Sequence, residues 1–116
     1  MGESGCIFCA IGAGTMSADM VHQDDRVIAF RDVAPRAPVH VLIIPKRHLA
    51  SVDAAGAEDE ELLGHLFSVA RDVARAEGLV PDGYRLVVNS GPAAGQTVDH
   101  LHVHLLGGRE LGWPPG

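Results

Sequence analysis

Cationic and aromatic residues are both scarce in this sequence of 116 residues. Nine Lys and Arg residues stand against 15 Asp and Glu residues, which gives a formal net charge of -6. Because proteins bind DNA and RNA mainly by neutralising phosphates, this balance argues against a general nucleic-acid-binding protein. Aromatic residues make up 4% of the chain, too few for a platform on which unpaired bases stack. One locally positive pocket for a small phosphate ligand is still compatible with the overall charge.

Long apolar runs and abundant cysteines are also missing. No stretch of the sequence is long and apolar enough to span a bilayer, and the N-terminus lacks the basic segment and apolar run of a secretory signal. We therefore expect a cytoplasmic protein with no membrane partner and no nucleic-acid partner. The chain has 2 cysteines, and in a reducing compartment these are not expected to form a structural disulfide.

The length and the composition fit one globular domain. A chain of this size leaves little room for a second domain and can bury a core without disulfides. Hydrophobic residues make up 47% of the chain and charged residues 21%, which are ordinary values for a folded protein. We expect a single domain over residues 1–116, with an N-terminal Cys-x-x-Cys segment at 1–17 and a C-terminal tail at 107–116.

Four strands and one main helix are predicted from hydrophobic periodicity and turn residues. The strands are expected at 26–31, 39–44, 84–89 and 98–106. The helix should begin around 53–57, where acidic residues suit its N-terminus, and should end at Gly78. Its apolar stripe consists of Leu62, Leu66, Val69 and Val73. His65 lies off this stripe and is expected at the surface. The pattern favours an α+β domain with an antiparallel sheet.

Three histidines alternate with apolar residues in the segment DHLHVHLL at 99–106. In an extended strand, His100, His102 and His104 share one face, with imidazoles that start roughly 7 Å apart. The opposite face carries Leu101, Val103 and Leu105. Chance is a poor explanation for three histidines at alternate positions on one face of a strand, so this segment is the candidate active site.

Two chemistries fit such a set of imidazoles. Neutral imidazole is abundant near pH 7, so one histidine can attack phosphorus while its neighbours orient it and neutralise developing charge. A leaving amine or alcohol would then need a proton. The rival is a zinc hydrolase in which all three histidines bind the metal and leave one position open.

Residues 100–106, HLHVHLL, resemble the signature of the histidine triad (HIT) family. The likeness covers nearly the whole chain and includes CIFC at 6–9, FRDVAP at 30–35, APVHVLIIPKRH at 37–48, VNSG at 88–91, GQTV at 95–98 and GGR at 107–109. Within the family, the chain is most similar to the Hint branch, the purine nucleoside phosphoramidases, down to the final WPPG at 113–116.

The resemblance implies both a fold and an activity. The fold is a HIT-like α+β fold with an antiparallel sheet of about five strands and one main helix, and two copies form a homodimer with a continuous sheet. The activity is cleavage of nucleoside 5′-phosphoramidates and aminoacyl-adenylate-like AMP or GMP substrates through a nucleotidyl-histidine intermediate. Two alternatives stay open: a dinucleoside polyphosphate hydrolase or nucleotidyl transferase of the same family, and a purine-nucleotide-binding regulatory protein.

The resemblance also assigns roles residue by residue. His102 matches the nucleophile, His104 a histidine that contacts the phosphate, and His40 a histidine that supports the nucleophile. His100, the first triad histidine, is counted with them. Asp32 matches the residue that binds the ribose hydroxyls, although taken alone it would be read as a turn cap. The residues matched to the α-phosphate and the leaving group are Asn89, Gly95, Gln96 and Thr97. Val33 and Phe8 are expected at the purine, and Trp113 is expected to reach the active site of the other subunit or else to lie in an exposed tail.

Cys6 and Cys9 provide half of a zinc site, because two cysteines at this spacing can share one metal ion. By resemblance to zinc-binding members of the family, His48 and His100 complete the site. His100 would then be structural and would couple the metal to the active site. We expect one structural zinc and no metal requirement for catalysis; the alternative is a pair of free thiols.

Overall fold

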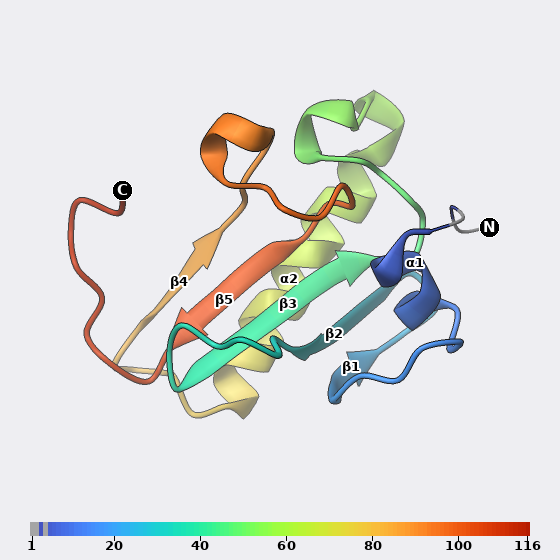
Figure 1. The fold of residues 1–116 in the computed structure, drawn as a ribbon. Helices are drawn as coiled ribbons and strands as arrows, with labels where there is room; N and C mark the ends of the chain where they lie inside the picture. Colours follow the sequence, from blue (N-terminus) through green and yellow to red (C-terminus); the bar gives the residue numbers. More distant parts are fainter. Residues whose placement is uncertain (1–2, 4) are drawn as a thin grey trace.

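The protein, described by a computed structural model over residue 3 and residues 5–116, is built on a five-stranded antiparallel sheet (Figure 1). The strands are β1 (Met20–Gln23), β2 (Val27–Arg31), β3 (Val39–Pro45), β4 (Tyr84–Val87) and β5 (Val103–Gly107). They lie in the order β1-β2-β3-β5-β4. With the one main helix, α2 (Glu60–Ala76), this sheet confirms the expected α+β architecture. Residues 1, 2 and 4 of the expected N-terminal segment lie outside the described residues.

Strand side chains alternate between two apolar cores, one on each face of the sheet. One core joins α2 to alternate residues of β2, β3 and β5, among them Val27, Ala29, Val41, Ile43, Val103 and Leu105. The other joins a short helix, α1 (Ile7–Gly12), to the intervening residues Ile28, Phe30, Leu42 and Ile44. Figure 1 shows α2 behind the sheet and α1 in front of it, at one end of β2 and β3. The side chains of β3 and β5 that share the α1 face include His40 and His104.

The helix α2 forms where acidic residues precede an apolar stripe. Acidic residues fill its first turn and Arg75 lies in its last turn, an order that suits the helix dipole. Its predicted stripe is buried at Leu66, Val69 and Val73 and partly buried at Leu62. The helix begins later than expected because two 3-10 turns, η1 (Val52–Ala54) and η2 (Ala57–Asp59), occupy the residues before it. It ends just before Gly78, as predicted, which takes a φ of 75°.

The last predicted strand is shorter than expected. The N–H of His100 donates to the Val98 carbonyl, and the N–H of Leu101 donates to the Leu49 carbonyl 2.7 Å away. These bonds tie residues 98–101 to a turn and to a loop, so regular pairing begins only at Val103. β1 and α1 were not predicted at all, because one has four residues of mixed polarity and the other has six. In the part of the chain that the structure describes, no helix has both the length and the apolarity needed to span a bilayer.

Candidate functional site

The histidines of the expected active site come from two neighbouring strands and the turn before one of them. His40 lies on β3 and His104 on β5, and His40 Nε2 is 3.0 Å from His104 Nδ1. His102 directly precedes β5, and its ring centroid is 4.9 Å from that of His104. Phe8 of α1 packs edge-on against His102 at 5.2 Å. The sheet and α1 together enclose these imidazoles, of which His40 and His102 are buried.

The triad segment alternates between the two faces of the sheet as predicted, but its three histidines do not share the same partners. Leu101, Val103 and Leu105 enter the core as predicted. His100, however, points its Nδ1 at the sulfurs of Cys6 and Cys9 and is fully buried there. The bend at residues 98–101 takes its ring away from a regular strand position. The triad therefore divides between two clusters, and its three rings do not converge on one metal ion.

One hydrogen bond selects the tautomer of His102 that a nucleophile requires. Its Nδ1 lies 2.7 Å from the carbonyl oxygen of His100. A carbonyl can only accept a hydrogen bond, so in the neutral ring Nδ1 carries the proton and Nε2 keeps a lone pair. A neutral imidazole with a free Nε2 is the nucleophilic form. The main chain of the first triad histidine thus orients the second.

His40 and His104 form a directional pair. The N–H of Arg36 donates to His40 Nδ1 at 3.0 Å, so the neutral His40 ring carries its proton on Nε2. That Nε2–H donates to His104 Nδ1, which leaves the proton of a neutral His104 on its own Nε2. The site therefore offers a lone pair on His102 beside an N–H donor on His104.

Burial keeps both members of this pair neutral. Burial lowers the pKa of His40, against the opposing effect of the Asp32 carboxylate, and the Arg36 charge lowers it further. Burial, followed by the neighbouring His102 and His40 rings, lowers the pKa of His104 to about 4. Near pH 7 the two rings are therefore neutral, and the direction of their hydrogen bond is the one that Arg36 sets.

Asp32 both caps a turn and faces the histidines. One carboxylate oxygen accepts the N–H of Ala34 at 2.8 Å, which is the turn-capping role considered from the sequence. The other lies 3.4 Å from His40 Nε2, so the carboxylate stands beside the active-site rings. The next residue, Val33, has a fully exposed side chain, with 101% relative accessibility.

The loop before the triad is braced by Gln96. Its side-chain amide donates to the carbonyls of Ala50 and Val98, at 2.7 and 3.0 Å, and its side-chain oxygen accepts the N–H of Gly91 at 2.8 Å. Two of these bonds lie within the loop, and the bond to Ala50 ties the loop to the segment that follows β3. Gly95 takes a φ of 92°, which favours glycine, and its N–H donates to the Pro92 carbonyl. Within the described residues, the N–H of Thr97 has no such acceptor.

Cys6, Cys9, His48 and His100 form a compact second cluster beside α1. Cys6 Sγ lies 3.4 Å from His100 Nδ1, and Cys9 Sγ lies 3.3 Å from His48 Nδ1 and 3.5 Å from His100 Nδ1. A tetrahedral zinc ion with bonds of about 2.3 Å to sulfur and about 2.0 Å to nitrogen separates such ligands by about 3.5 Å. The four side chains are therefore spaced as the ligands of one zinc ion.

The protonation of this cluster also fits a metal ion. His100 Nε2 donates to the Pro45 carbonyl at 2.8 Å, so Nδ1 presents a lone pair to the sulfurs. The Glu3 carboxylate, 3.7 Å from His48 Nε2, favours the same tautomer of that ring. Burial raises the pKa of the Cys9 thiol, so a cation would favour its thiolate form. The donor set, spacing and tautomers are those of a structural zinc site.

Asp32, His40 and His104 also place possible metal-ligand atoms close together. Their tautomers, however, do not suit a metal ion. A metal ion on His40 Nε2 would force the ring proton onto Nδ1, where the Arg36 N–H already points. Two N–H groups would then face each other. The main chain thus disfavours a metal ion at His40 Nε2.

A family model named HIT domain matches residues 13–111. The chain belongs to the HIT family. Among curated relatives, the 14 kDa zinc-binding protein of Zea mays is 49% identical over 116 residues, covering 98% of this chain and 90% of that protein. A HIT family hydrolase of Legionella pneumophila has a solved structure with a TM-score of 0.95 and 48% identity, covering 97% of this chain and 100% of that one.

Two further solved structures resemble this HIT protein closely. A Zn-bound histidine triad family protein of Mycobacterium smegmatis has a TM-score of 0.82 and 32% identity, covering 99% of this chain and 82% of that one. A histidine triad nucleotide-binding protein of Candida albicans has a TM-score of 0.81 and 32% identity, covering 95% of this chain and 83% of that one. The five-stranded sheet and its main helix are thus those of the HIT fold.

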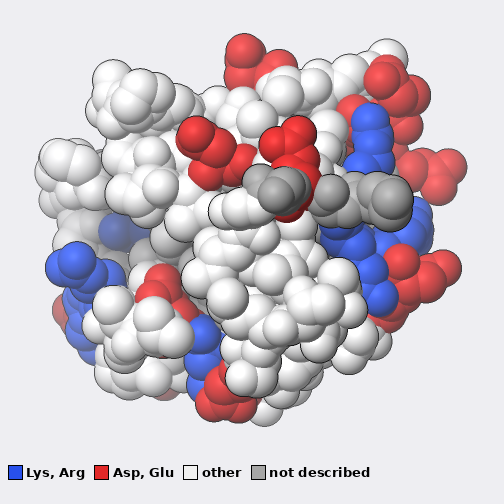
Figure 2. All heavy atoms as spheres, turned by 45° about the vertical axis from the view of Figure 1, so that its right-hand side comes forward, with Lys and Arg blue, Asp and Glu red and all other residues white. Residues whose placement is uncertain are grey.

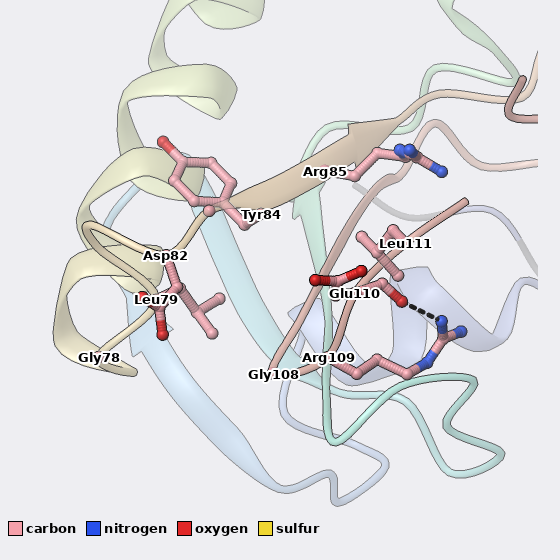
Figure 3. Close-up of a pocket in the computed structure, with 10 residues that line it drawn as sticks. Gly78, Leu79, Asp82, Tyr84, Arg85, Gly108, Arg109, Glu110 and Leu111 are labelled. Carbon is pink, nitrogen blue, oxygen red and sulfur yellow. Dashed lines mark hydrogen bonds between the residues drawn. The ribbon is translucent and has the colours of Figure 1, made fainter. Parts of the chain in front are cut away.

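The C-terminal tail of this HIT protein lies outside the histidine cluster. Trp113 is 80% exposed, and the guanidinium of Arg85 on β4 lies 5.8 Å from its ring centre. Arg85 also donates to the Gly112 carbonyl at 2.8 Å. The tail and the start of β4 border a hollow of about 680 Å³ with Arg85 and Arg109 at its walls (Figure 3).

Three residues form a cluster that the sequence did not predict. His22 Nε2 and His65 Nε2 lie 2.8 and 2.7 Å from the same oxygen of Asp24. His65, which was expected at the surface, is only partly exposed at 27%, and its side chain bridges α2 to the turn after β1. The only available signal was that Asp24 precedes a strand and His65 lies off the helix stripe.

The surface over α1 is mostly uncharged. Figure 2 shows white side chains across its centre, with Lys and Arg at the margins among Asp and Glu. On this face, the described residues present no continuous basic surface of the kind that follows a nucleic-acid backbone.

Proposed function

We propose that this HIT protein hydrolyses nucleoside 5′-phosphoramidates and aminoacyl-adenylate-like substrates to AMP through a nucleotidyl intermediate on His102. The observation that carries the proposal is the bond from His102 Nδ1 to the His100 carbonyl, which leaves Nε2 free beside the His104 donor. The hydrolase name of the Legionella structure supports the reaction class, and the nucleotide-binding name of the Candida structure supports the ligand class.

The reaction would proceed in two displacements at phosphorus. His102 Nε2 attacks, the phosphorus–nitrogen bond of the substrate breaks, and the leaving amine keeps the bonding pair and takes up a proton. Water then attacks the same phosphorus, loses a proton and releases AMP as the bond to Nε2 breaks. The His104 Nε2–H would donate to a phosphoryl oxygen in both steps, where a fixed donor stabilises developing charge. Because Arg36 and His40 set that donor in advance, no proton needs to move to prepare it.

Substrate contacts are proposed for the residues around this pair. Asp32 has a carboxylate oxygen beside His40 and is assigned to the ribose hydroxyls. Phe8 and exposed Val33 are assigned to the purine. Asn89, the Gly95 backbone and the Thr97 N–H are assigned to the phosphate. Gln96 would act there by bracing the loop, since its side chain bonds to Gly91 within the loop and to Ala50 in the segment after β3.

A homodimer completes the proposal. β4 is at one end of the sheet order and has one unpaired edge, so a second copy could extend the sheet there. The exposed Trp113 would then approach the leaving group bound to the other subunit. Light scattering at micromolar protein tests this arrangement, and a mass of 12.2 kDa would overturn it.

A structural zinc ion at Cys6, Cys9, His48 and His100 is supported by the geometry of that cluster and by two relatives, one named zinc-binding and one Zn-bound. When bound, zinc would link α1 to the end of β3 and to the triad segment. Thiolate ligation suits a reducing compartment, which supports a cytoplasmic location. The chemistry at phosphorus needs no group from the metal.

The decisive experiment measures amine release from an adenosine 5′-phosphoramidate. His102→Ala should lower the rate by at least about 10³-fold, because it removes the attacking atom. His22→Ala is the matched control, a histidine replacement outside the site. A chelator added during the assay should leave the native rate unchanged.

Undiminished release by His102→Ala would overturn the assignment of His102 as the nucleophile. AMP binding without release would favour the regulatory alternative. Turnover of a dinucleoside polyphosphate alone would favour the polyphosphate hydrolase.

A further inference from the structure

The C-terminal tail meets the loop before β3 at two points. Val39 pairs with Gly107 across β3 and β5, which brings the two segments together. Gly108 takes a φ of 92°, and a Cβ there would lie 2.9 Å from the Pro38 side chain. The next residue, Arg109, donates to the Arg36 carbonyl at 2.9 Å. The tail therefore packs directly on the turn that leads to His40.

Arg109 links that turn to the tail through both ends of its guanidinium. One terminal nitrogen reaches Arg36, and the other donates to the Glu110 carbonyl at 2.8 Å (Figure 3). In Figure 3, Arg109 lies across the hollow from Arg85 of β4. A planar guanidinium with two carbonyl acceptors fixes direction better than a single-point cation does.

The Arg36 residue held in this way also holds His40. Its N–H donates to His40 Nδ1, and this hydrogen bond disfavours three alternative states of the His40 ring. A donor opposite Nδ1 disfavours the tautomer protonated there, the imidazolium, and any form with a metal on Nε2. The Nε2–H of His40 then determines that His104 Nδ1 accepts and His104 Nε2 donates.

We propose that Arg109 is a positioning residue that acts through Arg36 and His40 to fix the tautomer of His104. Without Arg109, the exposed turn can rotate its peptides, and the Arg36 N–H no longer selects one tautomer of His40. The His40–His104 bond can then reverse, with His104 donating from Nδ1 and presenting a lone pair toward the phosphate. The kinetic consequence rests on the proposed function; the tautomer is a property of the folded chain alone.

The test is nitrogen NMR of histidine in protein labelled with ¹⁵N-histidine, which distinguishes ring nitrogens with a proton from those without one. In the native chain, His40 and His104 should each show a protonated Nε2 and a bare Nδ1. In Arg109→Gln, both rings should show averaged or reversed signals. Arg85→Gln is the matched control for this spectrum, because it releases the tail at Gly112 and leaves the contact with Arg36 in place.

Kinetics provide the second measurement. Arg109→Gln should lower kcat roughly three- to tenfold, the effect of one weakened hydrogen bond, with little change in KM. Arg109→Lys should recover part of the native spectrum, because one ammonium group can reach the Arg36 carbonyl. Arg71→Gln, an exposed arginine on α2, controls for the loss of charge.

Unchanged histidine tautomers in Arg109→Gln would overturn the proposal even if the rate fell. Reversed tautomers in that variant, in a protein whose native form releases no amine, would uphold the positioning role and overturn the proposed function instead. The two conclusions are therefore separable in one set of samples.

Discussion

Two histidine clusters lie on the α1 face of the sheet, and a single hydrogen bond to each ring decides what each cluster can do. At His100, a carbonyl acceptor on Nε2 leaves Nδ1 bare toward two sulfurs, which is the state of a metal ligand. At His40, an N–H donor on Nδ1 leaves Nε2 protonated toward His104, which is the state of a donor in acid–base chemistry. The same residue type thus acquires opposite chemistry from the main chain around it.

His102 stands between the clusters and depends on both. Its Nδ1 donates to the carbonyl of His100, whose side chain belongs to the metal cluster. Its ring lies against Phe8, which sits between the two cysteines in sequence and contacts His100 as well. The main chain of His100 therefore orients His102 while the side chain of His100 belongs to the metal cluster, and the ring of His104 lies beside His102.

The difference between the metal cluster and the His40–His104 pair is tested most directly by removing one ring of that pair. His104→Ala should lower amine release by about 10²- to 10⁴-fold, because it removes the donor at the phosphoryl group. It should leave the zinc content at about one ion per chain, since the metal cluster has its own ligands. Metal analysis and single-turnover kinetics on the same sample check both parts. Loss of zinc from His104→Ala would show that the two clusters are not separate.

The complementary change removes a metal ligand. Cys9→Ser should abolish zinc binding and lower the free energy of unfolding by about 4 kcal/mol when free zinc exceeds its dissociation constant about 1,000-fold. Calorimetric unfolding with and without added chelator measures this effect. Chelator should destabilise the native protein by a similar amount and leave the variant unaffected. A variant as stable as the native protein would show that the cysteines are free thiols.

The sequence predicted the residues of both clusters better than their arrangement. Hydrophobic periodicity was sufficient to predict the apolar stripe of α2 and the burial of Leu101 and Val103, because apolar side chains pack into the core. It could not predict that residues 98–101 bond to a loop instead of a strand, since those bonds depend on where Leu49 lies in the fold.

The tautomers could not be predicted either. The tautomer of His40 depends on the Arg36 N–H, and that of His100 depends on the Pro45 carbonyl. Nearly every residue has these main-chain groups, so the sequence does not show which of them will face a given ring. The roles of Arg36 and Arg109 were missed for the same reason. Resemblance indicated which histidines matter, and only the fold shows which nitrogen of each ring is free.

A third histidine cluster lies on the α2 face of the sheet. It differs from the other two because its rings, His22 and His65, donate hydrogen bonds to a carboxylate. His22 and His65 both donate to Asp24, which also accepts the N–H groups of Arg26 and Val27. Burial raises the pKa of Asp24, but these hydrogen bonds outweigh it and hold the pKa well below its ordinary value. We expect Asp24→Asn to lower the free energy of unfolding near pH 7 by about 2 kcal/mol, with activity and zinc content unchanged.

The pH dependence of that difference is the decisive measurement. A carboxyl whose pKa is lowered by folding stabilises the native state fully above its unfolded pKa of about 3.9, and the contribution is lost as the pH falls toward the native value. The difference between native protein and Asp24→Asn should therefore shrink as the pH falls below about 5. Asp25→Asn, which replaces the adjacent exposed carboxylate, should change stability little at any pH. An Asp24→Asn difference that persists unchanged into acid would mean that Asp24 acts through its neutral turn contacts, and that this cluster contributes no charge-dependent stability.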